Sequence, residues 1–287
     1  MFVEKVCHSL KFFIKAHRHK IGKNLFAESL IKRKGLGKHA KSIETLALGS
    51  SHCARAFYAD LVQNAYNLGN SNQDLYTSYQ LLKKYQPSMK KLKHVILFYA
   101  VFSPGHELSK TTIAKQVAIN HYVFDIPYPV SYLKSWKKGV EHRYKKFDDS
   151  GVDYDNYFGF VPDDASNPMP LEERCAKHIR ENQRQTHQTK YVKLVADLCQ
   201  KKNIQFSVVI CPCRKDYMQV ILTKVPQPFK ELKDLLTQSK YSSIQFCDWD
   251  SWKNFSDADF PDTDHVNSKG AKKFTLQLAE KLHLTVK

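Results

Sequence analysis

The stretch "IETLALGSSH", residues 43–52, joins a short apolar run to an abrupt turn. Its apolar residues stop at Gly49, and two serines and a histidine follow. A short apolar run that ends at a glycine predicts a buried strand closed by a tight turn. The next segment, "CARAFYADLVQ" (53–63), has apolar residues at helical spacing, so we expect a helix directly after the turn.

The same design recurs along the chain. Residues 64–85 contain a short apolar run, a turn at Gly69 and a helical pattern, and "KHVILFYAVF" (93–102) is the most continuous apolar run. Further strands are expected at 204–212 and 242–249, and helices at 171–203, 227–239 and 267–284. Strands that alternate with helices predict a mostly parallel sheet covered on both faces, which is a three-layer α/β/α sandwich.

Two segments fall outside this pattern. Residues 1–41 are basic and helical in pattern, and we interpret them as an N-terminal arm that precedes an α/β domain at 42–287. Residues 104–170 are rich in Tyr, Asp, Lys and Pro and interrupt the alternation, so we interpret them as an insertion over one face of the domain. The length of 287 residues and the 42% content of apolar residues suit a sizeable core.

The formal charge of +17 favours binding to polyanions: nucleic acid, an acidic membrane, an acidic polysaccharide or a phosphorylated cofactor. The sequence has no RNA-binding signature, no paired zinc fingers and no basic region that leads into heptads. These absences argue against nucleic acid as the main substrate.

The seven cysteines are odd in number and scattered, which favours reduced thiols and a cytoplasmic location. No apolar run is long enough to span a bilayer, and residues 1–20 lack the features of a signal peptide. Lysines surround the apolar positions of this first segment. It is therefore expected either to lie on an anionic membrane surface, at the inner face, or to dock on its own domain.

Polar loops follow several of the expected strands, and in a parallel sheet such loops line the ligand crevice. Ser51 follows the first strand, and the loop Asp262–His265 follows the last. A serine hydroxyl becomes a nucleophile when a histidine removes its proton, and a carboxylate on the other ring nitrogen orients that histidine. The sequence therefore predicts a catalytic set of Ser51, His265 and Asp262, with Asp264 pointing away.

The blocks "LALGSSH", "YNLGNSNQDL" and "DTDHVNSKGA" resemble the SGNH/GDSL hydrolase superfamily. In that family the serine lies in an early G-D-S block, and D-x-x-H lies near the C-terminus. The resemblance covers residues 43–103 and about 204–285, with Ser50 where the family usually has Asp. It implies a flavodoxin-like three-layer fold and a serine-dependent activity on esters.

The third block departs from the family, because residues 99–103 offer no Asn side chain for the oxyanion hole. Loss of one such donor costs about 3 kcal/mol of transition-state stabilisation. Our hypothesis is that the backbone N–H groups of Ser51 and Asn72 form the hole. Gly69, in the same turn, is also expected to contribute to the hole, and the side chain of Asn70 or Asn72 is expected to replace the missing donor.

Acyl transfer through Ser51 can end on water or on a sugar hydroxyl. The variant blocks are most similar to SGNH-type proteins of bacterial surface-polysaccharide assembly. This resemblance implies an O-acetyltransferase that moves an acetyl group from acetyl-CoA to an acidic, for example capsular, polysaccharide. A carbohydrate esterase and an inactive polyanion-binding module remain the alternatives.

Substrate-binding roles are expected for His52, next to the serine, and for Arg214 and Lys215, at the end of a strand. No metal is expected. The triplet 153–155 lies in the insertion, and the aspartates near His265 lack a glycine-punctuated ligand loop.

Overall fold

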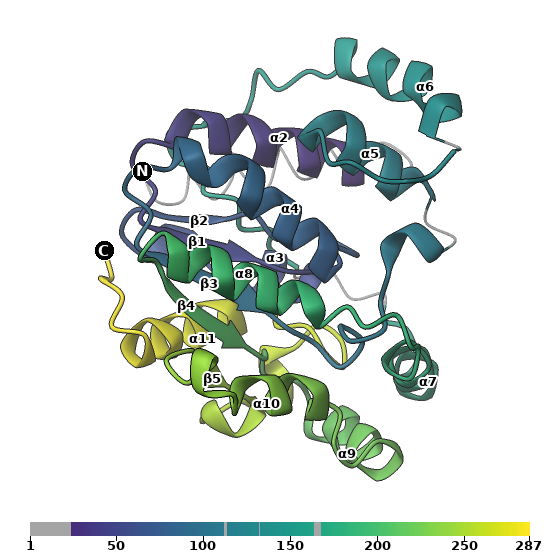
Figure 1. Ribbon diagram of the computed structural model, residues 1–287, viewed down its shortest axis with the longest axis vertical. Helices are drawn as coiled ribbons and strands as arrows, with labels where there is room; N and C mark the ends of the chain where they lie inside the picture. Colours follow the sequence, from purple (N-terminus) through teal and green to yellow (C-terminus); the bar gives the residue numbers. More distant parts are fainter. Residues whose placement is uncertain (1–23, 112–113, 132, 164–167) are drawn as a thin grey trace.

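A parallel five-stranded sheet organises the protein in the computed structural model, which describes residues 24–111, 114–131, 133–163 and 168–287. The strand order is β2-β1-β3-β4-β5, and each neighbouring pair is parallel (Figure 1). The strands are β1 (Thr45–Leu48), β2 (Ala65–Asn67), β3 (His94–Phe98), β4 (Gln205–Val209) and β5 (Gln245–Cys247). The direction of strand addition reverses beside β1, and parallel sheets of this order bind ligands at such a switch point.

The sheet is buried on both faces because successive strand residues point to opposite sides. In β1, Leu46 and Leu48 belong to one hydrophobic cluster, whereas Ala47 belongs to a second. The first cluster packs α2 (Asn24–His39), α4 (Leu75–Tyr85) and α8 (Lys190–Lys201) on one face, and the second packs α3 (Ser51–Ala56) and α11 (Ser268–Lys281) on the other (Figure 1). The predicted three-layer α/β/α sandwich is therefore confirmed.

The single helix expected at 171–203 is wrong, because the chain forms α7 (Leu171–Asn182) and then α8, with an irregular turn between them. The loop after β3 supplies hydrogen-bond partners to that turn. Asn182 Nδ2 donates to the carbonyl of Val101 at 2.6 Å, and the backbone N–H of Gln188 donates to the carbonyl of Pro104 at 3.0 Å. These bonds hold the break in place, and they set α7 at the carboxyl end of the sheet.

The segment 104–170 contains two helices that the sequence analysis did not assign, α5 (Ala114–Phe124) and α6 (Leu133–Lys145). α5 packs against α2, and α6 packs against α5. The later part of the segment returns to the sheet, where the carbonyl of Phe158 accepts a hydrogen bond from the N–H of Asn67 at 2.8 Å. The helices α9 (Lys215–Lys224) and α10 (Lys230–Leu236) lie beyond β4.

The described part of the expected N-terminal arm is α2, and it packs into the main hydrophobic cluster through Phe26, Leu30 and Leu36. Residues 1–23, which include the segment expected to contact a membrane, lie outside the described residues. Among the helices that the structure describes, none has both the length and the apolar character needed to cross a bilayer.

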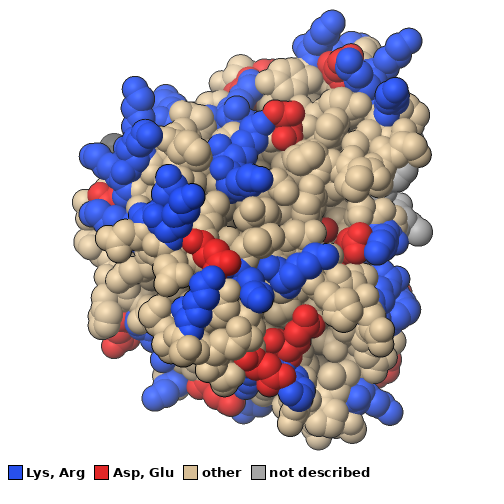
Figure 2. Space-filling model, viewed as in Figure 1, with Lys and Arg blue, Asp and Glu red and all other residues tan. Residues whose placement is uncertain are grey.

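Lys and Arg side chains occur in several separate groups on the face shown in Figure 2, with Asp and Glu side chains among them. On this face the described residues do not form one continuous basic patch. The net charge is therefore best understood locally, from the cations that surround particular cavities.

Candidate active site

The turn after β1 places Ser51 at the carboxyl end of the sheet. Gly49 has a φ of +147°, and a Cβ there would lie 2.7 Å from Cβ of Phe98, so this position requires glycine. Ser50 caps the short helix α3, with its side chain accepting a hydrogen bond from the N–H of His52, and Ser51 is the first helical residue. The tight turn fixes where the Ser51 hydroxyl can point.

Ser51, His265 and Asp262 form a continuous chain of short contacts, although 214 residues separate the serine from the histidine. Nε2 of His265 lies 2.8 Å from Oγ of Ser51, and Nδ1 of His265 lies 2.7 Å from Oδ2 of Asp262. If Nδ1 carries the proton and donates it to Asp262, Nε2 is free to accept from the serine hydroxyl. The structure thus brings together the three residues that the sequence analysis predicted as catalytic.

Asp262 also orders the loop that carries the histidine. Its Oδ1 accepts hydrogen bonds from the backbone N–H groups of Asp264, at 3.0 Å, and His265, at 2.7 Å. Burial works to raise the pKa of Asp262, but the hydrogen bond and charge of His265 outweigh burial and hold that pKa below its usual value. The carboxylate therefore stays ionised beside the imidazole.

A second histidine–carboxylate pair lies beside the first. Nε2 of His52 is 3.2 Å from Oδ2 of Asp264, and the rings of His52 and His265 have centroids 4.8 Å apart. Burial works against ionisation of Asp264, yet the charge of His265 and the contact with His52 hold its pKa well below the usual range. Contrary to expectation, Asp264 points inward and is 1% exposed.

Helix α7 places one guanidinium group, that of Arg174, against the carboxylates of both Asp262 and Asp264. Arg174 places Nε 3.3 Å from Oδ1 of Asp264 and Nη2 3.5 Å from Oδ2 of Asp262. On the next turn, Nδ1 of His178 lies 2.7 Å from the hydroxyl of Tyr217, and burial lowers the pKa of His178 to about 3. Arg174 thus balances the charge of two buried carboxylates, while His178 stays neutral.

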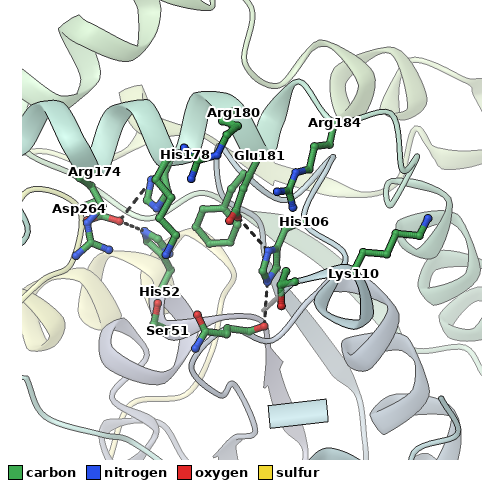
Figure 3. Close-up of a pocket in the computed structure, with 14 residues that line it drawn as sticks. Ser51, His52, His106, Lys110, Arg174, His178, Arg180, Glu181, Arg184 and Asp264 are labelled. Atoms are coloured by element: carbon green, nitrogen blue, oxygen red, sulfur yellow. Dashed lines mark hydrogen bonds and ion pairs between the residues drawn. The ribbon is translucent and has the colours of Figure 1, made fainter. Parts of the chain in front are cut away.

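A pocket of about 340 Å³ opens beside Ser51, between the strand-end loops and α7 (Figure 3). Ser51, His52 and Asn72 line it from the loops after β1 and β2, and Phe102 lines it from the loop after β3. The Phe102 ring packs between His52, at a centroid distance of 5.6 Å, and His178, at 4.8 Å. An aromatic ring therefore forms this part of the pocket wall.

The turn after β2 leaves one residue in position to complete an oxyanion hole. The N–H of Gly69 donates to Oδ1 of Asn67, and Nδ2 of Asn70 donates to Oε1 of Gln73, so these donors are used within the turn. The backbone N–H groups of Ser51 and Asn72 have no hydrogen-bond acceptor among the described residues. The prediction of Gly69 and Asn70 as oxyanion donors is therefore corrected, and Asn72 remains.

The backbone at Asn72 is held by a buried ion pair. Asn72 has a φ of 60°, and its carbonyl lies 3.1 Å from Nε2 of His106. Nδ1 of His106 contacts Oε2 of Glu181, on α7, at 3.0 Å. Burial opposes a charge on His106, but the contacts with Glu181 outweigh it and raise the pKa of the imidazole. A protonated His106 can then donate from Nε2 to the carbonyl of Asn72 while it forms an ion pair with Glu181.

Lys32 fixes the same turn from the opposite side. It lies on α2 and is fully buried, and its ammonium group donates a hydrogen bond to the carbonyl of Gly69. Its Nζ also lies 3.5 Å from Oε1 of Glu28, while burial lowers the pKa of the amine. A Cβ on Gly69 would lie 2.5 Å from Cβ of Cys53, so the turn packs closely against α3. Lys32 binds the same turn through the Gly69 carbonyl.

The predicted substrate-binding residues divide into two groups. His52 lines the pocket, but Arg214 and Lys215 do not. Arg214 donates through its guanidinium to the carboxylate of Asp216, and Lys215 begins α9 on the surface. The expected roles of Arg214 and Lys215 are thus corrected: the backbone N–H of Arg214 does donate to the carbonyl of Thr263, in the catalytic loop, but neither side chain lines the pocket.

Sequence reasoning missed three residues that shape the site: Lys32, His106 and Arg174. Lys32 and His106 lie in segments interpreted as an arm and an insertion, and Arg174 lies in a helix that appeared polar and exposed. No local motif marks them, since their partners are distant in sequence.

Two groups of side chains that share His265 could approach a metal ion at this place: His52, Asp264 and His265, and Asp163, Asp262 and His265. Ligand atoms of His52, Asp264 and His265 lie within 4.8 Å of one another. Both ring nitrogens of His265 already contact Ser51 and Asp262, so a metal bound through His265 would displace one of those contacts.

Comparisons with known proteins identify similar folds only. No family model and no curated protein matches the sequence. A protein from Streptococcus pneumonia, provisionally described as a platelet activating factor, aligns over 88% of this chain and 91% of its own, with 11% identity and a TM-score of 0.43. An acetyl xylan esterase from the rumen bacterium Butyrivibrio proteoclasticus aligns over 84% of this chain and 64% of its own, with 9% identity and a TM-score of 0.33. At these values the function has to be argued from the site itself.

Proposed function

We propose that this protein is an enzyme that transfers acyl groups through an ester on Ser51. The observation that carries the proposal is the chain of contacts from Ser51 Oγ to His265 Nε2, 2.8 Å, and from His265 Nδ1 to Asp262 Oδ2, 2.7 Å, beside an open pocket. This arrangement is what nucleophilic catalysis by a serine requires.

In the first half of the reaction, Oγ of Ser51 attacks the carbonyl carbon of a bound ester while Nε2 of His265 takes the hydroxyl proton. The backbone N–H groups of Ser51 and Asn72 donate to the oxyanion that forms. His265 then gives its proton to the departing thiolate or alkoxide, and an acyl-Ser51 ester remains. Asp262 stabilises the imidazolium throughout.

In the second half, His265 removes a proton from the acceptor, which attacks the acyl-Ser51 carbonyl. The bond between that carbonyl and Oγ then breaks, and His265 returns the proton to Oγ, which regenerates the serine. Water as the acceptor makes the enzyme an esterase, and a sugar hydroxyl makes it an O-acyltransferase. Following the resemblance to proteins of bacterial surface-polysaccharide assembly, we propose O-acetyl transfer to an acidic polysaccharide with acetyl-CoA as the donor. Neither the donor nor the acceptor alters the roles of the three residues.

The test follows the fate of the acetyl group. Purified protein is incubated with acetyl-CoA and an acidic polysaccharide, or with an acetylated sugar alone, and O-acetyl sugar and free acetate are measured by mass spectrometry. O-acetyl sugar formed from acetyl-CoA supports the transferase, whereas acetate released from the acetylated sugar with acetyl-CoA left intact supports the esterase. Turnover that persists in Ser51→Ala would contradict both.

A further inference from the structure

The wall of the pocket opposite Ser51 is basic. Lys177 and Arg180 lie on α7, and Arg184 lies in the turn that follows it. The spacing of three and four residues brings these side chains to one side of the helix, and all three line the pocket. Figure 3 shows Arg180 and Arg184 on the side of the pocket that faces Ser51. We refer to Lys177, Arg180 and Arg184 as the basic wall.

The cations of the basic wall are not paired with carboxylates in the part of the chain that the structure describes. Two carboxylates line the pocket, and each already has a cationic or imidazole partner: Glu181 contacts His106 at 3.0 Å, and Asp264 contacts Arg174 at 3.3 Å. No carboxylate among the described residues lies within 4.0 Å of a nitrogen of the basic wall. By contrast, Lys110 at the pocket edge is paired with Glu107 at 3.1 Å.

Unpaired cations in a concave site attract an anion more strongly than the same cations on a flat surface, because low-dielectric walls focus the field. Guanidinium groups also match carboxylates and phosphates in geometry, with two parallel hydrogen bonds. The basic wall and Ser51 line one pocket of about 340 Å³, which is in the range that holds a small ligand. An anion bound at the wall would therefore belong to the molecule whose acyl group reaches Ser51, or to one bound beside it.

We propose that the basic wall is an anion-binding subsite for the carboxylate or phosphate group of a substrate of Ser51. The inference rests on the proposed acyl transfer and adds the substrate class to it. Such a group has two sources, the carboxylate of an acidic sugar and the phosphates of coenzyme A. Arg214 and Lys215, predicted for this role from the sequence, lie away from the pocket, so the subsite depends on α7.

The test removes the wall in a protein that cannot turn over its ligand. In a Ser51→Ala background, Lys177→Gln, Arg180→Gln and Arg184→Gln are combined. The matched control combines Lys201→Gln, Lys202→Gln and Lys224→Gln, three exposed cations outside the pocket, so that both variants lose the same charge. Calorimetry measures the binding of O-acetylated glucuronic acid, O-acetylated glucose and coenzyme A.

If the anion is a sugar carboxylate, the parent protein binds the acidic sugar about tenfold more tightly than the neutral one, and the wall variant loses this preference while the control keeps it. If the anion is a phosphate, the wall variant loses about tenfold in affinity for coenzyme A and the control does not. The inference is overturned if neither affinity depends on the wall, or if the control loses as much as the wall variant.

This test is independent of catalysis. Failure of the proposed function would appear as an unreactive Ser51 in the wild-type protein, whatever the basic wall binds. Failure of the inference would appear as unchanged affinities in the wall variant, even where Ser51 is reactive.

Discussion

The strand-end loops and helix α7 meet at one pocket, but they contribute to it in opposite ways. The loops supply side chains that are buried and mutually paired: His265 is 4% exposed, Asp264 is 1% exposed, and both lie in a closed set of contacts. α7 and the turn after it supply Arg174 to this set, but they also supply the basic wall, whose cations have no carboxylate partner among the described residues and include the exposed Arg180 and Arg184. The difference suggests that the sheet fixes the chemistry, whereas the helix beyond the sheet selects what the chemistry acts on.

The largest effect is expected from His265→Ala, because it removes the base and leaves the basic wall intact. We expect kcat to fall about 10⁴-fold or more, with ligand binding in the pocket retained. The matched control is His142→Ala, at an exposed position of α6. A His265→Ala enzyme with nearly normal turnover would show that the loops do not supply the base.

The two carboxylates of the catalytic loop offer a sharper test within one region. Asp262→Asn removes the acceptor of the His265 Nδ1 proton, and we expect kcat to fall about 10³-fold with little change in stability. Asp264→Asn leaves His52 without its anion and Arg174 with the carboxylate of Asp262 alone, and we expect a loss of about 3 kcal/mol in the free energy of unfolding. Steady-state kinetics and urea unfolding of both variants would separate the catalytic role of Asp262 from the structural role of Asp264. An equal loss of kcat in the two variants would contradict this division.

Lys32 extends the comparison to α2, which reaches the site through the hydrogen bond from Lys32 to the Gly69 carbonyl. Lys32→Met removes that hydrogen bond while keeping the length of the side chain. We expect kcat to fall about tenfold at unchanged KM, since the turn that carries Asn72 loses a restraint. The control, Lys41→Met, alters an exposed lysine. If KM rises and kcat stays constant, Lys32 does not position the oxyanion turn.

The last expected effect is a gradual one, a pH dependence of stability that arises from α7. Burial lowers the pKa of His178 to about 3, so between pH 3 and the usual value of 6.5 the unfolded chain binds a proton that the folded protein does not. The contribution of neutral His178 to the free energy of unfolding is therefore complete above pH 6.5. It decreases as the pH falls, by up to about 1.4 kcal/mol per pH unit. Urea unfolding of His178→Gln and of the exposed control His142→Gln should show a shallower slope in the first variant alone.

Much of the fold could be predicted from the sequence, because apolar runs that end at Gly49 and Gly69 determine strands locally. The break between α7 and α8 could not be predicted, since its hydrogen bonds go to the carbonyls of Val101 and Pro104, about 80 residues away. The same limit explains α5 and α6, because α5 packs against α2 and α6 packs against α5, and neither contact can be inferred from the local sequence.

The candidate site shows a similar division. The D-x-x-H pattern puts Asp262 and His265 on one loop, so their contact follows from local geometry, and the strand order brings Ser51 to them. The basic wall and Arg174 escaped prediction because a helix with charges on one face is usually only solvated. What distinguishes α7 is the pocket beneath it, which only the three-dimensional arrangement reveals.

The most direct test of the central claim is covalent labelling of the wild-type protein by a fluorophosphonate, followed by mass spectrometry of its peptides. The account predicts a single adduct on the peptide that contains Ser51, and no adduct in Ser51→Ala or His265→Ala. An adduct on a different serine, or no adduct in wild-type protein that is folded, would contradict it.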